Sequence, residues 1–149
     1  MNSKQKHVET MLKIFETIEQ RNLQRPDPAK LHELFAPEVE FHWPPSLPYG
    51  GTTRGLKINS PGWADTWDSL QPTDAERRMD PRVVGADDDG QVVILWRQRG
   101  VSPAGERIDT PVLGLYKIRE GKLARAQMFY FDTAALLSFL AKAKGQLCT

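Results

Sequence analysis

The stretch Asp109–Asp132, DTPVLGLYKIREGKLARAQMFYFD, determines the fold of this chain. It contains two strand-like runs, 109–118 and 123–131. A short connection separates them and holds Glu120-Gly121, a pair typical of hairpin turns. Asp132 then begins an apolar stretch of helical character. The segment therefore predicts two antiparallel strands joined by a tight turn and followed by a C-terminal helix.

Alternation along the second strand divides its side chains between two faces, because successive strand residues point in opposite directions. One face carries Ala124, Ala126, Met128, Tyr130 and Asp132, and the other carries Leu123, Arg125, Gln127, Phe129 and Phe131. If the first face lines a cavity, Tyr130 and Asp132 lie at its polar end. A carboxylate beside a phenol suits proton transfer, because burial makes the acid more basic and the hydroxyl can hold a developing oxyanion.

Asp132 also has a structural interpretation. Aspartate is a preferred N-cap residue, and Asp132-Thr133 directly precedes the apolar run Ala134–Leu140. The carboxylate would then accept hydrogen bonds from free N–H groups of the first helical turn. The two roles can coexist, and the sequence leaves both open.

Length and composition restrict the class of protein. The chain has 149 residues, which fits a single domain over 1–149 with room for a ligand-sized cavity. A formal net charge of +1, with cations dispersed among acids, predicts no binding to nucleic acid. A lone cysteine, Cys148, excludes an intramolecular disulfide. The sequence has no apolar run typical of a signal peptide or a membrane span, so we expect a soluble cytoplasmic protein without a membrane partner.

The first half of the chain predicts three helices, one strand and a long loop. An apolar stripe predicts an amphipathic helix from Lys4 to about Asn22, and a shorter helix follows from Asp27 to Pro37. Glu38–Trp43 alternates as a strand. Pro44–Gly55 is rich in proline and glycine and predicts a lid-like loop without regular structure. Ser60-Pro61 is typical of the start of the third helix.

The second half predicts a strand meander with tight turns. Its strands are expected at Arg77–Ala86, Gln91–Gly100, Glu106–Ile118 and Leu123–Phe131. The order of elements predicts an α+β fold, in which the N-terminal helices and the third helix cover one face of a curved antiparallel sheet. Such a cone-shaped sheet encloses a space that is a natural site for a small molecule.

Aromatic residues supply candidates for the wall of that site. Trp43, Trp63 and Trp67 lie within one segment, and Tyr49 is on the loop that can cover them. Such a cluster suits either an ordinary core or an aromatic pocket. His42 alternates with Trp43 along the strand, so only one of the two can face the pocket.

Four short segments carry a family likeness. They are FAPEVEF at Phe35–Phe41, GTTRG at Gly51–Gly55, YKIREGKL at Tyr116–Leu123 and YFDTAALL at Tyr130–Leu137. In order and spacing they resemble the SnoaL-like branch of the nuclear transport factor 2-like superfamily. The resemblance spans most of the chain and implies a cone-shaped α+β barrel, commonly dimeric. Members include ketosteroid isomerases, polyketide cyclases, limonene epoxide hydrolases, dehydratases and binding proteins, so the fold alone does not select a reaction.

The resemblance carries over to individual residues only in part. Trp43 before Pro44 most nearly matches the general base of the isomerases, and Gly114 lies near the position of their oxyanion-stabilising acid. Neither residue has the required chemical group, which argues against steroid isomerisation by that mechanism. The polyketide cyclases are similar in having an acid/base aspartate late in the chain, and Asp132 is its counterpart here.

These observations favour a cofactor-free acid/base enzyme acting on a small, apolar carbonyl compound. Asp132 is the predicted acid/base, and Tyr130 and His42 are predicted to polarise the carbonyl. The predicted substrate-binding residues are Trp43, Tyr49, Trp63, Trp67 and Met128. The alternative is a non-catalytic protein of the same fold that binds an apolar ligand or a partner protein. The three histidines show no spacing typical of a metal site, and no nucleotide-binding motif is present, so we expect neither metal nor cofactor.

Two further predictions concern the strand surfaces. Leu113 and Leu115 alternate away from the covered face and would leave an apolar stripe on the helix-free side, which predicts a homodimer. Asp109 is expected to pair with Arg97 or Arg99 on the neighbouring strand, or to form a polar pocket floor with them if all three point inward.

Overall fold

The computed structural model describes residues 2–19, 32–55, 62–73 and 76–147. The elements in chain order are α1 (Ser3–Glu19), β1 (Phe35–Trp43), β2 (Gly51–Arg54), α3 (Trp63–Trp67), the 3-10 turn η2 (Asp68–Leu70), β3 (Arg82–Ala86), β4 (Gln91–Val101), β5 (Arg107–Arg119), β6 (Lys122–Tyr130) and α4 (Thr133–Leu147). No helix in these ranges is long and apolar enough to cross a membrane.

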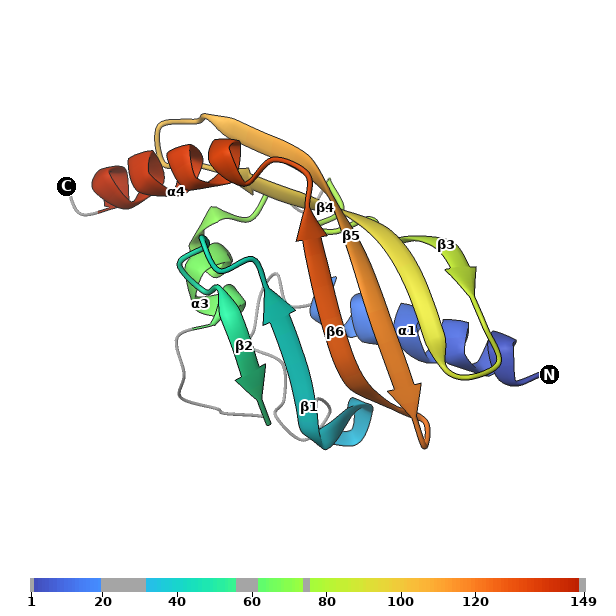
Figure 1. The fold of residues 1–149 in the computed structure, drawn as a ribbon. Helices are drawn as coiled ribbons and strands as arrows, with labels where there is room; N and C mark the ends of the chain where they lie inside the picture. The colour runs from blue at the N-terminus through green and yellow to red at the C-terminus, as the bar shows by residue number, and fades with distance from the viewer. Residues whose placement is uncertain (1, 20–31, 56–61, 74–75, 148–149) are drawn as a thin grey trace.

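Six strands form one sheet in the order β2-β1-β6-β5-β4-β3 (Figure 1). The pairs are antiparallel except for β1 and β6, which run parallel. α1 crosses one face of the sheet and contacts β3 and β4, while α4 lies at one end (Figure 1). We call the face toward α1 the inner face and the opposite face, which no described helix covers, the outer face. The predicted α+β class is confirmed, with one parallel pairing that the strand pattern alone did not reveal.

Two hydrophobic clusters hold the layers together. On the inner face, the alternating residues of β4 pack against the apolar stripe of α1, through Val92, Ile94, Trp96, Met11, Ile14 and Phe15. At the end of the sheet, α4 packs on α3 and η2, where Trp67 stacks on Phe139 with ring centroids 5.9 Å apart. Gly100 leaves room for Trp67, because a Cβ at Gly100 would lie 2.8 Å from the indole ring. These contacts place α3 over the inner face.

Two expectations for the first half were wrong. β1 begins at Phe35, so no helix extends to Pro37, which lies inside the strand. The register shifts between Phe35 and Glu40, and such an irregularity accommodates a proline that has no N–H to donate. The loop after β1 contains β2, because turns reverse the chain and the β-branched Thr52 and Thr53 then pair with β1. Residues 20–31, with most of the predicted second helix, and Ser60-Pro61 lie outside the described residues.

The meander follows the prediction with two local differences. β3 begins at Arg82 instead of Arg77, because Asp80 adopts a positive φ of 45° that interrupts the extended chain. In β6, Leu123 is buried together with Ala126, Met128 and the rest of the inner face, although strict alternation assigns it to the other side. A register shift in the β5–β6 pairing at Ile118 moves the start of the strand by one residue and reverses its faces there.

Candidate functional site

The inner face carries a run of hydrogen bonds between uncharged side chains. Tyr130 of β6 donates its hydroxyl hydrogen to Gln98 Oε1 of β4 at 3.1 Å. Tyr49, between β1 and β2, donates to the Tyr130 hydroxyl oxygen at 2.9 Å. Two indole N–H groups of α3 also donate, from Trp63 to Gln98 Oε1 at 2.9 Å and from Trp67 to the Tyr49 hydroxyl at 3.2 Å. We call these five side chains the phenol–amide network.

Gln98 Oε1 is the final acceptor of the phenol–amide network. The sequence analysis did not predict Gln98 as a site residue. The side chain is 1 % exposed, so its amide oxygen depends on protein donors, and it accepts two. A signal was available in the sequence. Alternation along β4 puts Gln98 on the same face as Ile94 and Trp96, and a polar residue at a buried apolar position is a candidate for a specific hydrogen-bonding role.

Burial keeps both phenols of the network neutral. It raises the pKa of Tyr49 to about 12, although the hydrogen bonds with Tyr130 and Trp67 oppose the rise. The pKa of Tyr130 is raised well above its ordinary value, first by burial and then by Tyr49. Both hydroxyls therefore stay protonated at neutral pH and act as hydrogen-bond donors in a largely apolar environment.

Half-buried aromatic rings surround the network. Trp43 of β1 meets Tyr49 edge-on at 5.2 Å between ring centroids, and Tyr130 at 6.4 Å. Phe41 stacks on Trp43 at 6.3 Å. Phe41, Trp43, Trp63 and Tyr130 are only partly buried, so part of this aromatic wall remains accessible to solvent. The structure thus brings together Trp43, Tyr49, Trp63, Trp67 and Tyr130, while their role in substrate binding stays a prediction.

A compact turn positions Tyr49. The Leu47 N–H donates to the Pro44 carbonyl at 3.1 Å, and the Gly50 N–H donates to the Leu47 carbonyl at 2.9 Å. Gly50 is required, because a Cβ there would lie 2.1 Å from the Pro44 carbonyl oxygen. Leu47 and Tyr49 are both buried, so the predicted lid is a packed part of the wall.

Arg78 lies over the ring of Trp63, which belongs to this wall. Its guanidinium carbon is 4.4 Å from the centroid of the Trp63 ring, and its side chain is 2 % exposed. It also pairs with Asp68 at 3.3 Å. A cation over an indole face is a favourable contact, and it helps to hold Trp63 with its N–H toward Gln98. Met128, a predicted binding residue, lies deeper, buried in the core opposite Gly114 of β5.

The structure separates His42 from the phenols. Trp43 faces inward, so alternation turns His42 to the outer face. There its Nε2 lies 3.2 Å from Glu40 and its Nδ1 lies 3.2 Å from the Thr52 hydroxyl. Hydrogen bonds from His42 and then Arg54 lower the pKa of Glu40. The sheet therefore lies between His42 and Tyr130, and the predicted role of His42 in polarising a carbonyl stays a prediction without a supporting contact.

Asp132 has the capping geometry that the sequence left open. Its carboxylate accepts a hydrogen bond from the Ala135 N–H at 2.9 Å, and its carbonyl accepts one from the Leu136 N–H at 3.3 Å. The residue is exposed and follows Phe131, which is 82 % exposed. The polar partners of the phenol–amide network include no carboxylate among the residues described, so an acid/base role of Asp132 stays a prediction without a supporting contact.

The outer face carries charges where the inner face carries neutral donors. Asp109 accepts hydrogen bonds from Arg97 at 2.8 Å, Arg99 at 3.3 Å and Arg107 at 3.3 Å, and Glu76 pairs with the last two of these. The predicted pairing of Asp109 with Arg97 and Arg99 is confirmed. Burial of Asp109 opposes its ionisation, but Arg97 and Arg99 together lower its pKa.

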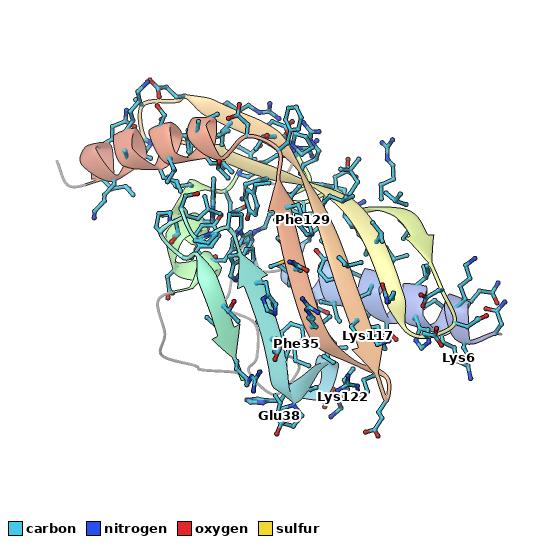
Figure 2. All side chains as sticks on the ribbon, in the orientation of Figure 1. Lys6, Phe35, Glu38, Lys117, Lys122 and Phe129 are labelled. Carbon is cyan, nitrogen blue, oxygen red and sulfur yellow. The ribbon has the colours of Figure 1, made fainter. Side chains whose placement is uncertain are left out.

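The rest of the outer face divides into an apolar and a charged part. Phe129 of β6 is 51 % exposed and lies directly opposite Leu113 of β5, which is 40 % exposed. Figure 2 shows Phe129 toward the α4 end of the sheet, with Lys117, Lys122 and Glu38 toward the opposite end. A depression of about 850 Å³ lies among these charged residues. Within the described ranges, no group of three or more His, Cys, Asp and Glu side chains is arranged to hold a metal ion.

Fold and sequence comparisons agree on the class of protein. The sheet and helices have the fold of the nuclear transport factor 2-like proteins. A structure of this class from Burkholderia pseudomallei K96243 has a TM-score of 0.66 at 21 % sequence identity, and the match covers 91 % of this chain and 97 % of that chain. The profile of the SnoaL-like domain matches residues 16–126, and this chain belongs to the SnoaL-like family.

Individual relatives support the same assignment. The uncharacterized protein Rv0034 of Mycobacterium tuberculosis H37Rv is 32 % identical over 117 residues, which cover 78 % of this chain and 86 % of the relative. The structure of TerC co-crystallized with polyporic acid has a TM-score of 0.71 at 20 % identity and covers 91 % of this chain and 98 % of TerC. A putative SnoaL-like polyketide cyclase from Jannaschia sp. CCS1 has a TM-score of 0.61 at 19 % identity, with 93 % of each chain covered. At such identities the structures show the fold alone.

Proposed function

We propose that this protein binds a small, flat, apolar carbonyl compound at the inner face, with the phenol–amide network as the polar end of the site. The observation that carries the proposal is the run of neutral donors that leads from Tyr49 through Tyr130 to Gln98 inside a wall of aromatic rings. Apolar walls with a few placed polar groups are typical of small-molecule sites. The co-crystallization of TerC with polyporic acid supports a small organic ligand for this fold.

Tyr130 is the group that can change partner when a carbonyl arrives. Its hydroxyl has one hydrogen, which now goes to Gln98. If that hydrogen turns to a ligand carbonyl, Gln98 Oε1 keeps the hydrogen bond from Trp63, and Tyr130 still accepts from Tyr49. No buried acceptor is left unsatisfied by the exchange, so binding does not incur the usual cost of breaking a buried hydrogen bond.

Binding of 1-tetralone, a bicyclic monoketone, tests this proposal by titration calorimetry. Tyr130→Phe keeps the ring but removes the donor, and we expect the dissociation constant to rise roughly 5- to 10-fold, as for the loss of one buried hydrogen bond. His42→Gln on the outer face is the matched control and should leave the affinity unchanged. Equal affinity of wild type and Tyr130→Phe would remove the support for the phenol as the carbonyl donor.

Acid/base catalysis on such a carbonyl is the second candidate. It is favoured by the raised pKa of Tyr130, because a neutral phenol in an apolar site stabilises an enolate oxygen as charge develops. Asp132 is the candidate base and must release its hydrogen bond from Ala135 to act. Asp132→Asn keeps the cap but cannot accept a proton, so turnover should fall about 10²- to 10⁴-fold if this reading holds. Full activity of Asp132→Asn would leave Asp132 with the capping role alone.

We further propose a homodimer through the outer face. Leu113 and Phe129 are exposed side by side, and Leu115 continues the apolar strip along β5. Soluble monomers rarely leave such a strip uncovered. The adjoining charged part carries both signs, with Glu38 beside Lys117 and Lys122, so a two-fold axis can bring opposite charges of two copies together.

A further inference from the structure

A threonine, a histidine and a glutamate form a row on the outer face, across the paired strands β1 and β2. The Thr52 hydroxyl lies 3.2 Å from His42 Nδ1, and His42 Nε2 lies 3.2 Å from the Glu40 carboxylate. The other oxygen of Glu40 accepts a hydrogen bond from Arg54 at 2.5 Å. We call these four side chains the outer array. A hydroxyl, an imidazole and a carboxylate in this order are the parts of an activated nucleophile.

The charge of Glu40 determines the direction of the hydrogen bonds. Hydrogen bonds from His42 and then Arg54 lower the pKa of Glu40, so its carboxylate is ionised at neutral pH and can only accept. In the neutral imidazole, Nε2 therefore carries the hydrogen, and Nδ1 is left to accept the hydrogen of the Thr52 hydroxyl. His42 is thus placed as the base for Thr52, while Glu40 and Arg54 are positioning residues.

The strand pairing supplies a donor for developing negative charge. The Gly55 N–H donates to the Val39 carbonyl at 2.8 Å, and hydrogen-bonded and non-hydrogen-bonded pairs alternate along an antiparallel ladder. His42 and Thr52 therefore form a non-hydrogen-bonded pair, in which the side chains approach closely and the Thr52 backbone N–H points away from β1. Because β2 is the end strand of the described sheet, this N–H lies at the sheet edge. A backbone N–H beside the nucleophile suits an oxyanion.

The outer array is open to solvent and borders a concave surface. Thr52 is exposed, and the side chains of His42 and Glu40 are 25 % and 28 % exposed. Glu40 and Arg54 also line the depression of about 850 Å³ on the outer face. The apolar strip proposed as the dimer contact lies on β5 and β6, and β1 separates those strands from β2. A small molecule can therefore lie in the depression beside the array.

We propose that the outer array is a second chemical site, at which Thr52 attacks small activated carboxylic esters. The Thr52 oxygen bonds to the acyl carbon, the ester C–O bond breaks, and the hydroxyl proton passes through His42 Nδ1 to the departing alcohol. Water then attacks the acyl-threonine and gives a proton to His42, which returns it to the Thr52 oxygen as the acid leaves. The sheet separates this site from the phenol–amide network, so the inference is independent of the ligand proposed there.

Hydrolysis of 4-nitrophenyl acetate by the whole chain tests this proposal. We expect Thr52→Val and His42→Gln each to lower the second-order rate constant roughly 100-fold, as for the loss of a nucleophile or of its base. Thr52→Ser keeps the hydroxyl and should retain most of the activity. Thr53→Val is the matched control, because Thr53 is also an exposed residue of β2 but points to the opposite face, and its rate should equal that of the wild type. Circular dichroism checks that each variant is folded.

Mass spectrometry of protein quenched during turnover gives a direct readout of the intermediate. An acetyl group should be found on Thr52 of the wild type, and Thr52 should remain unmodified in His42→Gln. Hydrolysis that depends on His42 but persists in Thr52→Val would overturn the proposal, because the imidazole would then act on the ester without Thr52. Hydrolysis no faster than in protein-free buffer would also overturn it.

Discussion

The two faces of one sheet differ in the chemistry of their polar groups. On the inner face of β4, Gln98 accepts hydrogen bonds from neutral donors and is almost fully buried. On the outer face of the same strand, Arg97 and Arg99 bind the carboxylate of Asp109. Neighbouring residues of a strand point to opposite sides, so one segment builds both arrangements. The neutral face therefore suits the uncharged ligand proposed above, whereas ion pairs on the charged face connect neighbouring strands beside water.

The largest expected effect is the loss of stability caused by a substitution on the inner face. Trp67 is completely buried, stacks on Phe139 and donates to Tyr49, so Trp67→Ala should lower the free energy of unfolding by about 3 to 5 kcal/mol. Urea denaturation measures the loss. Phe131→Ala removes another aromatic ring, but one that is 82 % exposed, and should change stability by less than about 0.5 kcal/mol. Equal losses would contradict the difference between the faces.

The next effect concerns assembly through the outer face. Leu115→Glu places a charge within the apolar strip beside Leu113, and the dissociation constant of the dimer should rise roughly 100-fold. Sedimentation at micromolar protein distinguishes the dimer from a 16.9 kDa monomer. Leu12→Glu, at an exposed leucine of α1, is the control and should leave assembly unchanged. A wild-type protein that sediments only as monomer would reject the dimer.

A smaller effect tests the charged cluster of the outer face. Asp109→Asn weakens the contacts of three arginines and should cost about 1 to 2 kcal/mol at neutral pH. Because its folded pKa is lowered, the Asp109 carboxylate stabilises the fold above the unfolded pKa of about 4, and this contribution is lost as the pH falls through the folded pKa. The difference in free energy of unfolding between wild type and Asp109→Asn should therefore be constant from about pH 5 to 8 and should disappear in more acidic solution. The control is Asp88→Asn, in an exposed turn, whose free energy of unfolding should equal that of the wild type.

The smallest effect separates the two roles of Asp132 by stability. Asp132→Ala removes the acceptor for the Ala135 N–H and should cost about 1 kcal/mol, whereas Asp132→Asn should cost only a few tenths. Thermal unfolding of the two variants measures the difference. Identical melting temperatures for Asp132→Ala and Asp132→Asn would show that the cap does not stabilise the fold, and would favour a chemical role for Asp132.

Local pattern was sufficient for much of the fold. The β5–β6 hairpin, the β4 strand and the capped C-terminal helix follow from alternation, turn residues and capping preference, which act between residues close in sequence. Alternation along β1 also predicted that the side chains of Trp43 and His42 point to opposite faces of the sheet. It could not say which of them faces inward, because that depends on where α1 packs, and α1 is far away in the chain.

The site itself was decided by tertiary structure. Tyr49 and Tyr130 are 81 positions apart and meet only because β1 pairs in parallel with β6, a contact that no local pattern encodes. The same packing brings Gln98 of β4 within hydrogen-bond distance of Tyr130. Local sequence pattern therefore predicted most of the elements, the family resemblance and the aromatic composition of the wall, but not β2 or the parallel pairing of β1 with β6. Which polar groups converge was decided by long-range strand pairing, since hydrogen bonds between distant side chains require the sheet to be assembled first.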